Sequence, residues 1–479
     1  MAPSPTMRRP GRLPSLGLAA GAFVAIAGWV IGLRPLADNS FFTHLATGRI
    51  ILDTGSVPSV DPYTFTAQGA PWVVQSWLAS VLYATAEALA GATGLRALMG
   101  CTAAALCAVA WRLTRPASSI VPRLAIGVVF VAAGAELWAE RPLMLGLLAF
   151  AGVILAANGE LDPRWLVPIG WLWVNVHGSF PLGLVYLAVV AVGRRMDGGS
   201  PRAELRSLGW LLVGVLLGAV GPLGPGVLTF PYELLQRQDV LRNVIEWRAP
   251  TFDSLSQRAF LLQSALVALA LVRRPSYRSG LLVAVFGAAA LLGARNLSVA
   301  SLVFLPVLAG AAPEWGRLRS GSRTRLGTVL VALAIGAATV FGAARLGQRD
   351  FELRGYPIDA LAYLDEQGIG LPDQRMAAKD VVGNLVELLY GPGNRVFYDD
   401  RFDMFPTAAS AAHLALVQNG PTLRRDLDRF EIDLLTLERA GTTAQRVIVD
   451  PAWRVLYSDE DWLVSCRRGA PLGGRVGRC

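Results

Sequence analysis

A small set of charged, histidine and amide residues stands beside long apolar segments, where polar side chains are uncommon. Asp38 directly follows an apolar run and shortly precedes His44 in LADNSFFTHLATG. An ionisable group at membrane depth costs on the order of 2.5–3.5 kcal/mol, so each needs a partner, a water-filled cavity or a function. The others occur in four short stretches: Glu140 and Arg141 in WAERPLM, Asn175 and His177 in WVNVHGSF, Glu246 and Arg248 in IEWRAP, and Arg295 and Asn296 in GARNLS.

A carboxylate beside arginines suits transfer of a sugar from a lipid-linked phosphate donor. The acid accepts a proton from the attacking hydroxyl, and the planar guanidinium stabilises the departing phosphate. Nucleotide sugars are cytoplasmic, and the chain carries neither a Gly-rich phosphate loop nor a Walker motif. The residue types therefore predict Asp38 as the base and a lipid-linked donor, while His177 as the base of an acyltransferase is a further enzyme alternative.

Composition places these residues in a membrane protein. Hydrophobic residues make up 53% of the chain and charged residues 16%, and the apolar residues gather in long segments. The net charge of +9 resides largely in arginines between those segments, where it sets orientation, so no nucleic-acid partner is expected. The first apolar segment is too long for a signal peptide and is interpreted as an uncleaved transmembrane helix.

Eleven membrane-spanning helices are predicted from the apolar segments. They cover residues 14–35, 96–112, 118–136, 142–158, 164–176, 179–193, 207–222, 259–272, 279–294, 297–313 and 326–344. The alternate loops MRRPGR, WRLTRP, GRRMDGGSPRAELR, RRPSYRSG and GRLRSGSRTR are rich in arginine. By the positive-inside rule these loops are cytoplasmic, which predicts an N-inside, C-outside topology in the cytoplasmic membrane.

Three stretches lie outside this transmembrane part, residues 1–345. Residues 38–91, here the loop segment, and residues 223–258 form outer loops, and the loop segment carries two amphipathic interfacial helices. Residues 346–479, here the tail, form a small α/β domain outside the cytoplasm. Its expected helices are IDALAYLDEQG, VVGNLVELLYG and TLRRDLDRF, and its expected strands are RVFYDD, IDLLTL, RVIVD, RVLYS and WLVSCR.

This topology puts all the polar residues named above on one side of the membrane, although some are separated by about 250 positions in the sequence. That convergence is the main functional signal, because each residue alone has an ordinary explanation. Asp38 suits the cap of a helix starting at Ser40. The other ordinary explanations are mutual neutralisation of Glu140 and Arg141, an interfacial His44, backbone satisfaction by Asn175 and His177, and a headgroup anchor at Arg295.

The order of these motifs resembles the GT-C superfamily of integral membrane glycosyltransferases, which includes protein O-mannosyltransferases and the lipid A aminoarabinose transferase. The stretch from ADNSFFTH to SWLASVLY is similar to a bacterial subgroup with a D-x-D-x-W-W-H opening and a D-P-[FY]-[ST] element. That subgroup also carries RP, N-x-H-G, EW-x-x-P and V-F-x-D-x-R-x-D motifs. Here they stand as Arg141-Pro142, Asn175 to Gly178, Glu246 to Pro250 and VFYDDRFD from 396.

The resemblance implies that Asp38 is the catalytic acid-base residue and that the other motif residues contact the donor. They are His44, Glu140, Arg141, Asn175, His177, Glu246, Arg295 and Asn296. Ser40 replaces the second Asp of the opening, so a divalent metal is not favoured and no cofactor is expected. The implied partners are a polyprenyl-phosphate sugar, a glycan, lipid or protein acceptor in the cell envelope, and membrane lipids.

Two other classes remain open. A transporter or flippase would also line a cavity with charged and amide groups, but no internal repeat is evident. A structural envelope protein would act through the tail, whose Asp399, Asp400, Arg401 and Asp403 suit either a charged turn or acceptor recognition. Cys466 and Cys479 would pair if the tail is outside the cytoplasm, and the alternative leaves them free.

Overall fold

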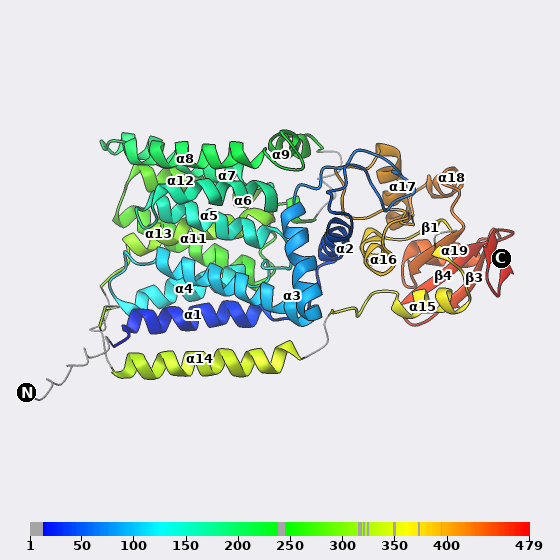
Figure 1. The fold of residues 1–479 in the computed structure, drawn as a ribbon, viewed down its shortest axis with the longest axis horizontal. Coiled ribbons are helices and arrows are strands. Elements are labelled where there is room, and N and C mark those ends of the chain that lie inside the picture. The colour runs from blue at the N-terminus through cyan, green and yellow to red at the C-terminus, as the bar shows by residue number, and fades with distance from the viewer. Residues whose placement is uncertain are drawn as a thin grey trace, which may run out of the picture.

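The computed structural model describes residues 13–237, 245–314, 319, 321–322, 325–347, 351–371, 374–393 and 395–479. Each of the eleven apolar segments contains a helix. Most run side by side in a bundle along the long axis of the molecule, with the tail at one end (Figure 1). The bundle helices are α1 (Leu16–Gly32), α3 (Trp77–Leu113), α4 (Ile120–Gly134), α5 (Leu143–Ala157), α6 (Leu166–Val176), α7 (Pro181–Met196), α8 (Arg202–Gly218), α11 (Leu255–Arg273), α12 (Tyr277–Leu292), α13 (Leu297–Gly310) and α14 (Arg325–Leu346).

Three described helices are long and apolar enough to cross a membrane: α3, α11 and α14. Five shorter helices or helical stretches are also apolar: α1, α4, α5, α12 and Ala294–Gly310. Small residues allow close helix packing, as at Gly32, where a Cβ atom would lie 2.6 Å from the Met99 carbonyl oxygen. The structure thus supports a helical protein associated with a membrane, and the count of eleven crossings stays a prediction.

The loop segment forms α2 (Asn39–Thr54) and the first part of α3. Helix α3 is broken at Ala90 and Gly91, whose backbone angles are not helical. The part before the break stands across the end of the bundle, and the part after it runs along α1 (Figure 1). An interfacial helix followed by a separate bundle helix, as the sequence predicts, therefore fits this geometry.

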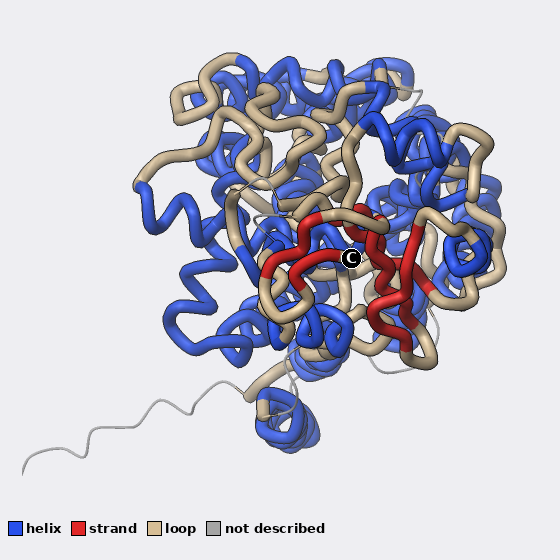
Figure 2. The backbone as a smooth tube through the Cα atoms, turned by 90° about the vertical axis from the view of Figure 1, so that its right-hand side faces the viewer, coloured by secondary structure: helices blue, strands red, loops and turns tan. Residues whose placement is uncertain are grey.

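The tail combines helices with two small sheets. The larger sheet has the order β1-β2-β4-β3. Strand β1 (Met376–Ala377) is parallel to β2 (Leu434–Glu438), and β4 (Trp462–Arg467) is antiparallel to both β2 and β3 (Trp453–Ser458). Figure 2 views the strands from the tail end, and β5 (Pro471–Gly473) pairs with β6 (Gly477–Arg478). The tail helices are α15 (Ile358–Glu366), α16 (Asp380–Tyr390), α17 (Thr407–Gln418), α18 (Leu423–Arg429) and α19 (Thr442–Val449).

Two strand predictions in the tail are wrong. RVIVD lies mostly in helix α19, because Ala444 and Val447, spaced as on one helical face, are the residues that the fold buries. RVFYDD is not a strand of the sheet, and its Val396 forms only an isolated parallel bridge with Thr64 of the loop segment. Its apolar residues are buried by packing against the loop segment and the tail helices, which a strand-like sequence does not reveal.

The tail and the loop segment contribute side chains to the same hydrophobic core. Ala67 of the loop segment belongs to the same buried cluster as Phe397, Tyr398 and Leu435 of the tail. Helix α16 packs on α2, where the Thr43 hydroxyl donates to Glu387 and the Asn384 amide donates to Thr43 Oγ1 at 2.7 Å. The tail is thus fixed to the loop segment that carries Asp38.

Candidate functional site

A cavity of about 450 Å³ opens between the bundle end, α2 and the tail. Five of the nine residues predicted for the site line it: His44, Arg141, His177, Glu246 and Arg295. They come from α2, the turn before α5, the end of α6, a short 3-10 helix at Ile245–Trp247, and another at Ala294–Asn296. Segments far apart in the sequence therefore meet in one polar cavity.

Asp38 stands at the edge of this cavity and caps helix α2. Its Oδ1 accepts the Ser40 backbone N–H at 3.0 Å, and its Oδ2 accepts Arg141 Nε at 2.6 Å. The capping explanation is therefore correct, and the same carboxylate also contacts the cavity-lining arginine. Helix capping orients the carboxyl group, because it holds one oxygen in place and leaves the other directed to Arg141.

Arg141 joins two carboxylates. Its Nη1 lies 2.5 Å from Glu246 Oε1, opposite its contact with Asp38. Burial acts against the charge, but the carboxylates of Asp38 and Glu246 prevail and raise the pKa of Arg141. Arg141 therefore remains a cation aimed between Asp38 and Glu246.

Glu140 does not pair with Arg141, so the alternative explanation of mutual neutralisation in this turn does not hold. Its buried carboxylate lies 3.7 Å from Arg34 Nε and accepts the backbone N–H of Asp38 at 3.3 Å. Burial raises the pKa of Glu140. The side chains of adjacent residues diverge here, so Glu140 holds the entry to α2 while Arg141 faces the cavity.

Both histidines that line the cavity have a lowered pKa, which favours the neutral ring. Burial lowers the pKa of His44 to about 4, and burial together with Arg295 lowers the pKa of His177 to about 3. His44 Nδ1 lies 3.2 Å from Ser80 Oγ, and His177 Nδ1 lies 2.8 Å from Ser179 Oγ. Both rings can thus exchange hydrogen bonds with a ligand without adding charge.

Arg295 is the second cation of the cavity. Its guanidinium carbon stacks 4.3 Å from the centre of the Trp247 ring, which fixes its plane. Asn296, beside it, donates to the Ala289 carbonyl oxygen at 2.9 Å and serves the backbone. Asn175 is buried, where its Oδ1 accepts from Trp77 Nε1 at 2.8 Å and its Nδ2 donates to the Trp171 carbonyl at 2.8 Å, so the backbone explanation holds for Asn175.

The tail supplies carboxylates that the sequence did not assign to the site. Asp380, Asp400 and Asp403 line the cavity together with the serines Ser40 and Ser76. Ser40 links the two halves, since its hydroxyl donates to Asp400 while its backbone N–H donates to Asp38. The signal was present in VFYDDRFD, but only the fold shows which of its acids faces the cavity.

Among the three tail carboxylates that line the cavity, Asp400 has the largest shift of its pKa. Burial raises its pKa to about 6, although the hydrogen bond from Ser40 acts in the opposite direction. Burial also raises the pKa of Asp403. A carboxyl group that titrates close to neutrality is suited to proton transfer.

A buried ion-pair network fixes the tail beside the cavity. Arg401 lies 2.8 Å from Asp61 of the loop segment and 2.6 Å from Asp399, with Glu387 at 3.4 Å. Its guanidinium also stacks on Trp72, 4.4 Å from the ring centre. This network positions Asp400, the residue between Asp399 and Arg401, without itself lining the cavity.

The cavity offers the guanidinium groups of Arg141 and Arg295 to an anion, and its carboxylates can accept a proton. Within the described residues, no group of three or more His, Cys, Asp and Glu side chains is arranged to hold a metal ion. Compared with known proteins, the sequence matches no family model, and no curated protein shows significant similarity to it.

Proposed function

We propose that this chain is a membrane glycosyltransferase that moves a sugar from a polyprenyl-phosphate donor to an envelope acceptor at the outer face of the cytoplasmic membrane. The observation that carries the proposal is the shared cavity, which Arg141, Arg295, Glu246 and the tail carboxylates line, with Asp38 bound to Arg141 at its edge. Two fixed cations suit a phosphate, and a nearby carboxylate suits the base that a hydroxyl acceptor needs.

In this reaction Asp38 takes the proton of the acceptor hydroxyl as its oxygen attacks the anomeric carbon of the donor. The bond from that carbon to the phosphate oxygen breaks, and polyprenyl phosphate leaves with the electron pair. Arg141 and Arg295 stabilise its charge. The donor phosphate competes with Asp38 for Arg141, which frees Asp38 Oδ2 at the moment when a base is required.

The proposed topology has eleven crossings, with the N-terminus inside and the tail outside. Three observations support it: the alternation of arginine-rich loops, the three helices able to cross a membrane, and the disulfide between Cys466 and Cys479. Disulfides persist outside the cytoplasm and are rare within it. In this orientation the cavity faces the outer leaflet, where a lipid-linked donor meets an envelope acceptor.

The decisive experiment is a transfer assay with membranes containing the full chain, a labelled polyprenyl-phosphate sugar and cell-envelope acceptors. Asp38→Asn should lower the transfer rate by about 100-fold or more, because Asn cannot accept the proton. Asn is also a good N-cap, so α2 should remain folded. The matched control is Asp53→Asn, which changes an exposed Asp on the same helix and should leave transfer unchanged.

Full transfer by Asp38→Asn would refute the assignment of Asp38 as base. Movement of the labelled lipid across the membrane without covalent transfer would instead identify a transporter. If every cavity variant kept full sugar transfer and full lipid movement, a structural role in the envelope would be favoured.

A further inference from the structure

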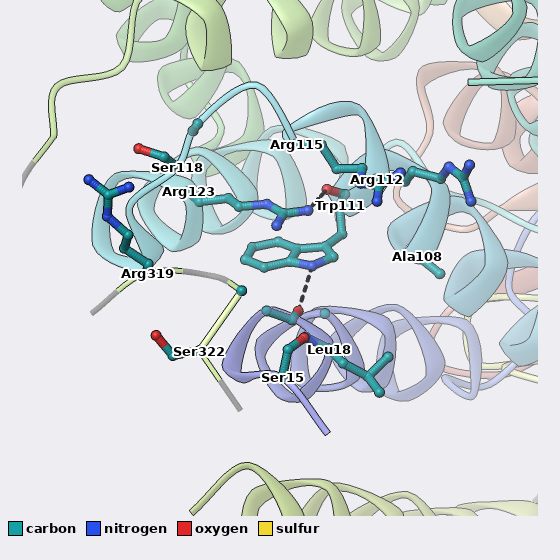
Figure 3. Close-up of a pocket in the computed structure, with 14 residues that line it drawn as sticks. Ser15, Leu18, Ala108, Trp111, Arg112, Arg115, Ser118, Arg123, Arg319 and Ser322 are labelled. Atoms are coloured by element: carbon teal, nitrogen blue, oxygen red, sulfur yellow. Dashed lines mark hydrogen bonds between the residues drawn. The ribbon is translucent and has the colours of Figure 1, made fainter. Parts of the chain in front are cut away.

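A second cavity, of about 850 Å³, lies at the end of the bundle where α1 begins and α3 ends. Figure 3 shows its lining residues in close-up. It is lined by the start of α1, the end of α3, the start of α4 and residues just before α14. Asp38 follows the far end of α1, so roughly 16 Å of helix, from Gly21 to Gly32, separates this cavity from the one described above. The two cavities are separate features.

Positive charge predominates around the second cavity. Four arginines line it: Arg112, Arg115, Arg123 and Arg319. Glu160 is shared by Arg112 at 3.0 Å and Arg115 at 3.2 Å, and Glu314 lies 3.9 Å from Arg319. Arg123 forms no ion pair with any described residue. Four cations therefore face two carboxylates, and the remaining charge attracts an anion.

Arg123 is held in a fixed orientation. Its guanidinium carbon lies 4.1 Å from the centre of the Trp111 ring, and its nitrogens donate to the Trp111 carbonyl at 2.7 Å and to Thr114 Oγ1 at 2.8 Å. Trp111 in turn donates from Nε1 to the Gly17 carbonyl at 2.8 Å, as the dashed line in Figure 3 shows. This preset cation distinguishes the cavity from a surface of freely moving arginines.

The cavity is polar at the bundle end and apolar further in. Ser15 and Ser118 lie at the polar end, and both are close to helix N-termini that carry partial positive charge. Leu18, Gly21 and Ala108 continue the lining along the helices, with Gly21 about 9 Å beyond Ser15 along α1. The lining thus offers an anion site joined to an exposed apolar helix surface.

We propose that this cavity binds one anionic phospholipid, with the phosphate among the arginines and an acyl chain along Leu18 and Ala108. A free phosphate would use the polar end alone, whereas a phospholipid fits both parts of the lining. The cavity lies at the end of the bundle that carries the described arginine-rich loops WRLTRP and RRPSYRSG, whose Arg112 and Arg278 bind Glu160 and Asn158 at the end of α5. Basic pockets between transmembrane helices on the cytoplasmic side suit anionic headgroups. The proposal needs the chain to be in a membrane and does not depend on sugar transfer.

The test adds phosphatidylglycerol, phosphatidylcholine or inorganic phosphate to the purified full chain. Mass spectrometry measures the bound lipid, and thermal denaturation measures the melting temperature of the protein. We expect binding of phosphatidylglycerol with at least tenfold preference over phosphatidylcholine. Replacing Arg112 and Arg115 by Gln should weaken that binding about fivefold per charge. Arg273→Gln, at an exposed position on the same end of the bundle but outside the cavity, is the matched control.

Ala108→Phe distinguishes a lipid from a free anion, because its ring occupies the apolar part of the lining and leaves the arginines in place. It should weaken phosphatidylglycerol binding, while Ala268→Phe, on an exposed face of α11, should not. Equal binding of the two lipids, or unchanged binding by the double arginine variant, would overturn the proposal. Equal stabilisation by phosphate, with no effect of Ala108→Phe, would also overturn it in favour of a free-anion site.

Discussion

At the scale of single residues, the geometry of the site is set by the ion pairs that its charged side chains form. Arg141 has Glu140 as its chain neighbour, yet it binds Asp38 and Glu246. Ser40 links Asp38 to Asp400, so a carboxylate from the tail stands beside the start of α2. The local charge pattern therefore differs from the one that the chain order suggests.

The raised pKa of Asp400, about 6, predicts a pH dependence of transfer. If the ionised form holds Ser40 and Asn384 in place, activity should fall as the pH is lowered from about 7 to 5, with a midpoint near 6. Asp400→Asn should have low activity and no such midpoint. An unchanged pH profile in Asp400→Asn would exclude Asp400 as the titrating group.

The free energy of unfolding should rise on acidification through Asp400, whereas the transfer activity should fall. The folded-state pKa of Asp400 lies above the unfolded value of about 3.9, so the folded protein binds the proton more tightly. Lowering the pH from about 7 to 4 should therefore raise the melting temperature through this group, and the gain should be smaller in Asp400→Asn. Loss of activity with a gain in stability separates a functional effect from unfolding.

At the scale of elements, the buried cation Arg401 fastens the tail to the loop segment. Arg401→Gln should destabilise the protein by about 3–5 kcal/mol, because it leaves the carboxylates of Asp61, Asp399 and Glu387 close together and uncompensated. Hydrogen exchange should rise first in α16 and around Asp61. Arg354→Gln, at a highly exposed ion pair, is the control, and equal destabilisation by both variants would contradict this role.

The break in α3 depends on Gly91, whose φ of 57° is unfavourable for other residues. Gly91→Ala should lower stability by about 1–3 kcal/mol, because the two parts of α3 must keep their different directions. Gly280→Ala in α12, at a glycine with open space around its Cβ position and without a positive φ, should be neutral or stabilising. A melting temperature unchanged by Gly91→Ala would show that the break tolerates a side chain.

At the scale of the whole molecule, the proposed topology places the two cavities near opposite membrane surfaces. Cysteine labelling in intact cells tests it in a Cys101→Ser background. Arg425→Cys, in the tail, should react with an impermeant maleimide, whereas Ser200→Cys, between α7 and α8, should react only after permeabilisation. The reverse pattern would invert the orientation and place the Asp38 cavity in the cytoplasm.

The sequence by itself determined the helical bundle, the tail's mixed content and the residues that merit attention. Apolar runs and helical periodicity reflect which side chains of a single helix or strand are buried. They therefore predicted a helix in each of the eleven segments, and they predicted the strands β2, β3 and β4. The tertiary structure decided which polar groups meet. Asp400 joined the Asp38 cavity, Glu140 turned away from Arg141, and RVIVD became helical, because these outcomes depend on contacts between segments that local periodicity does not encode.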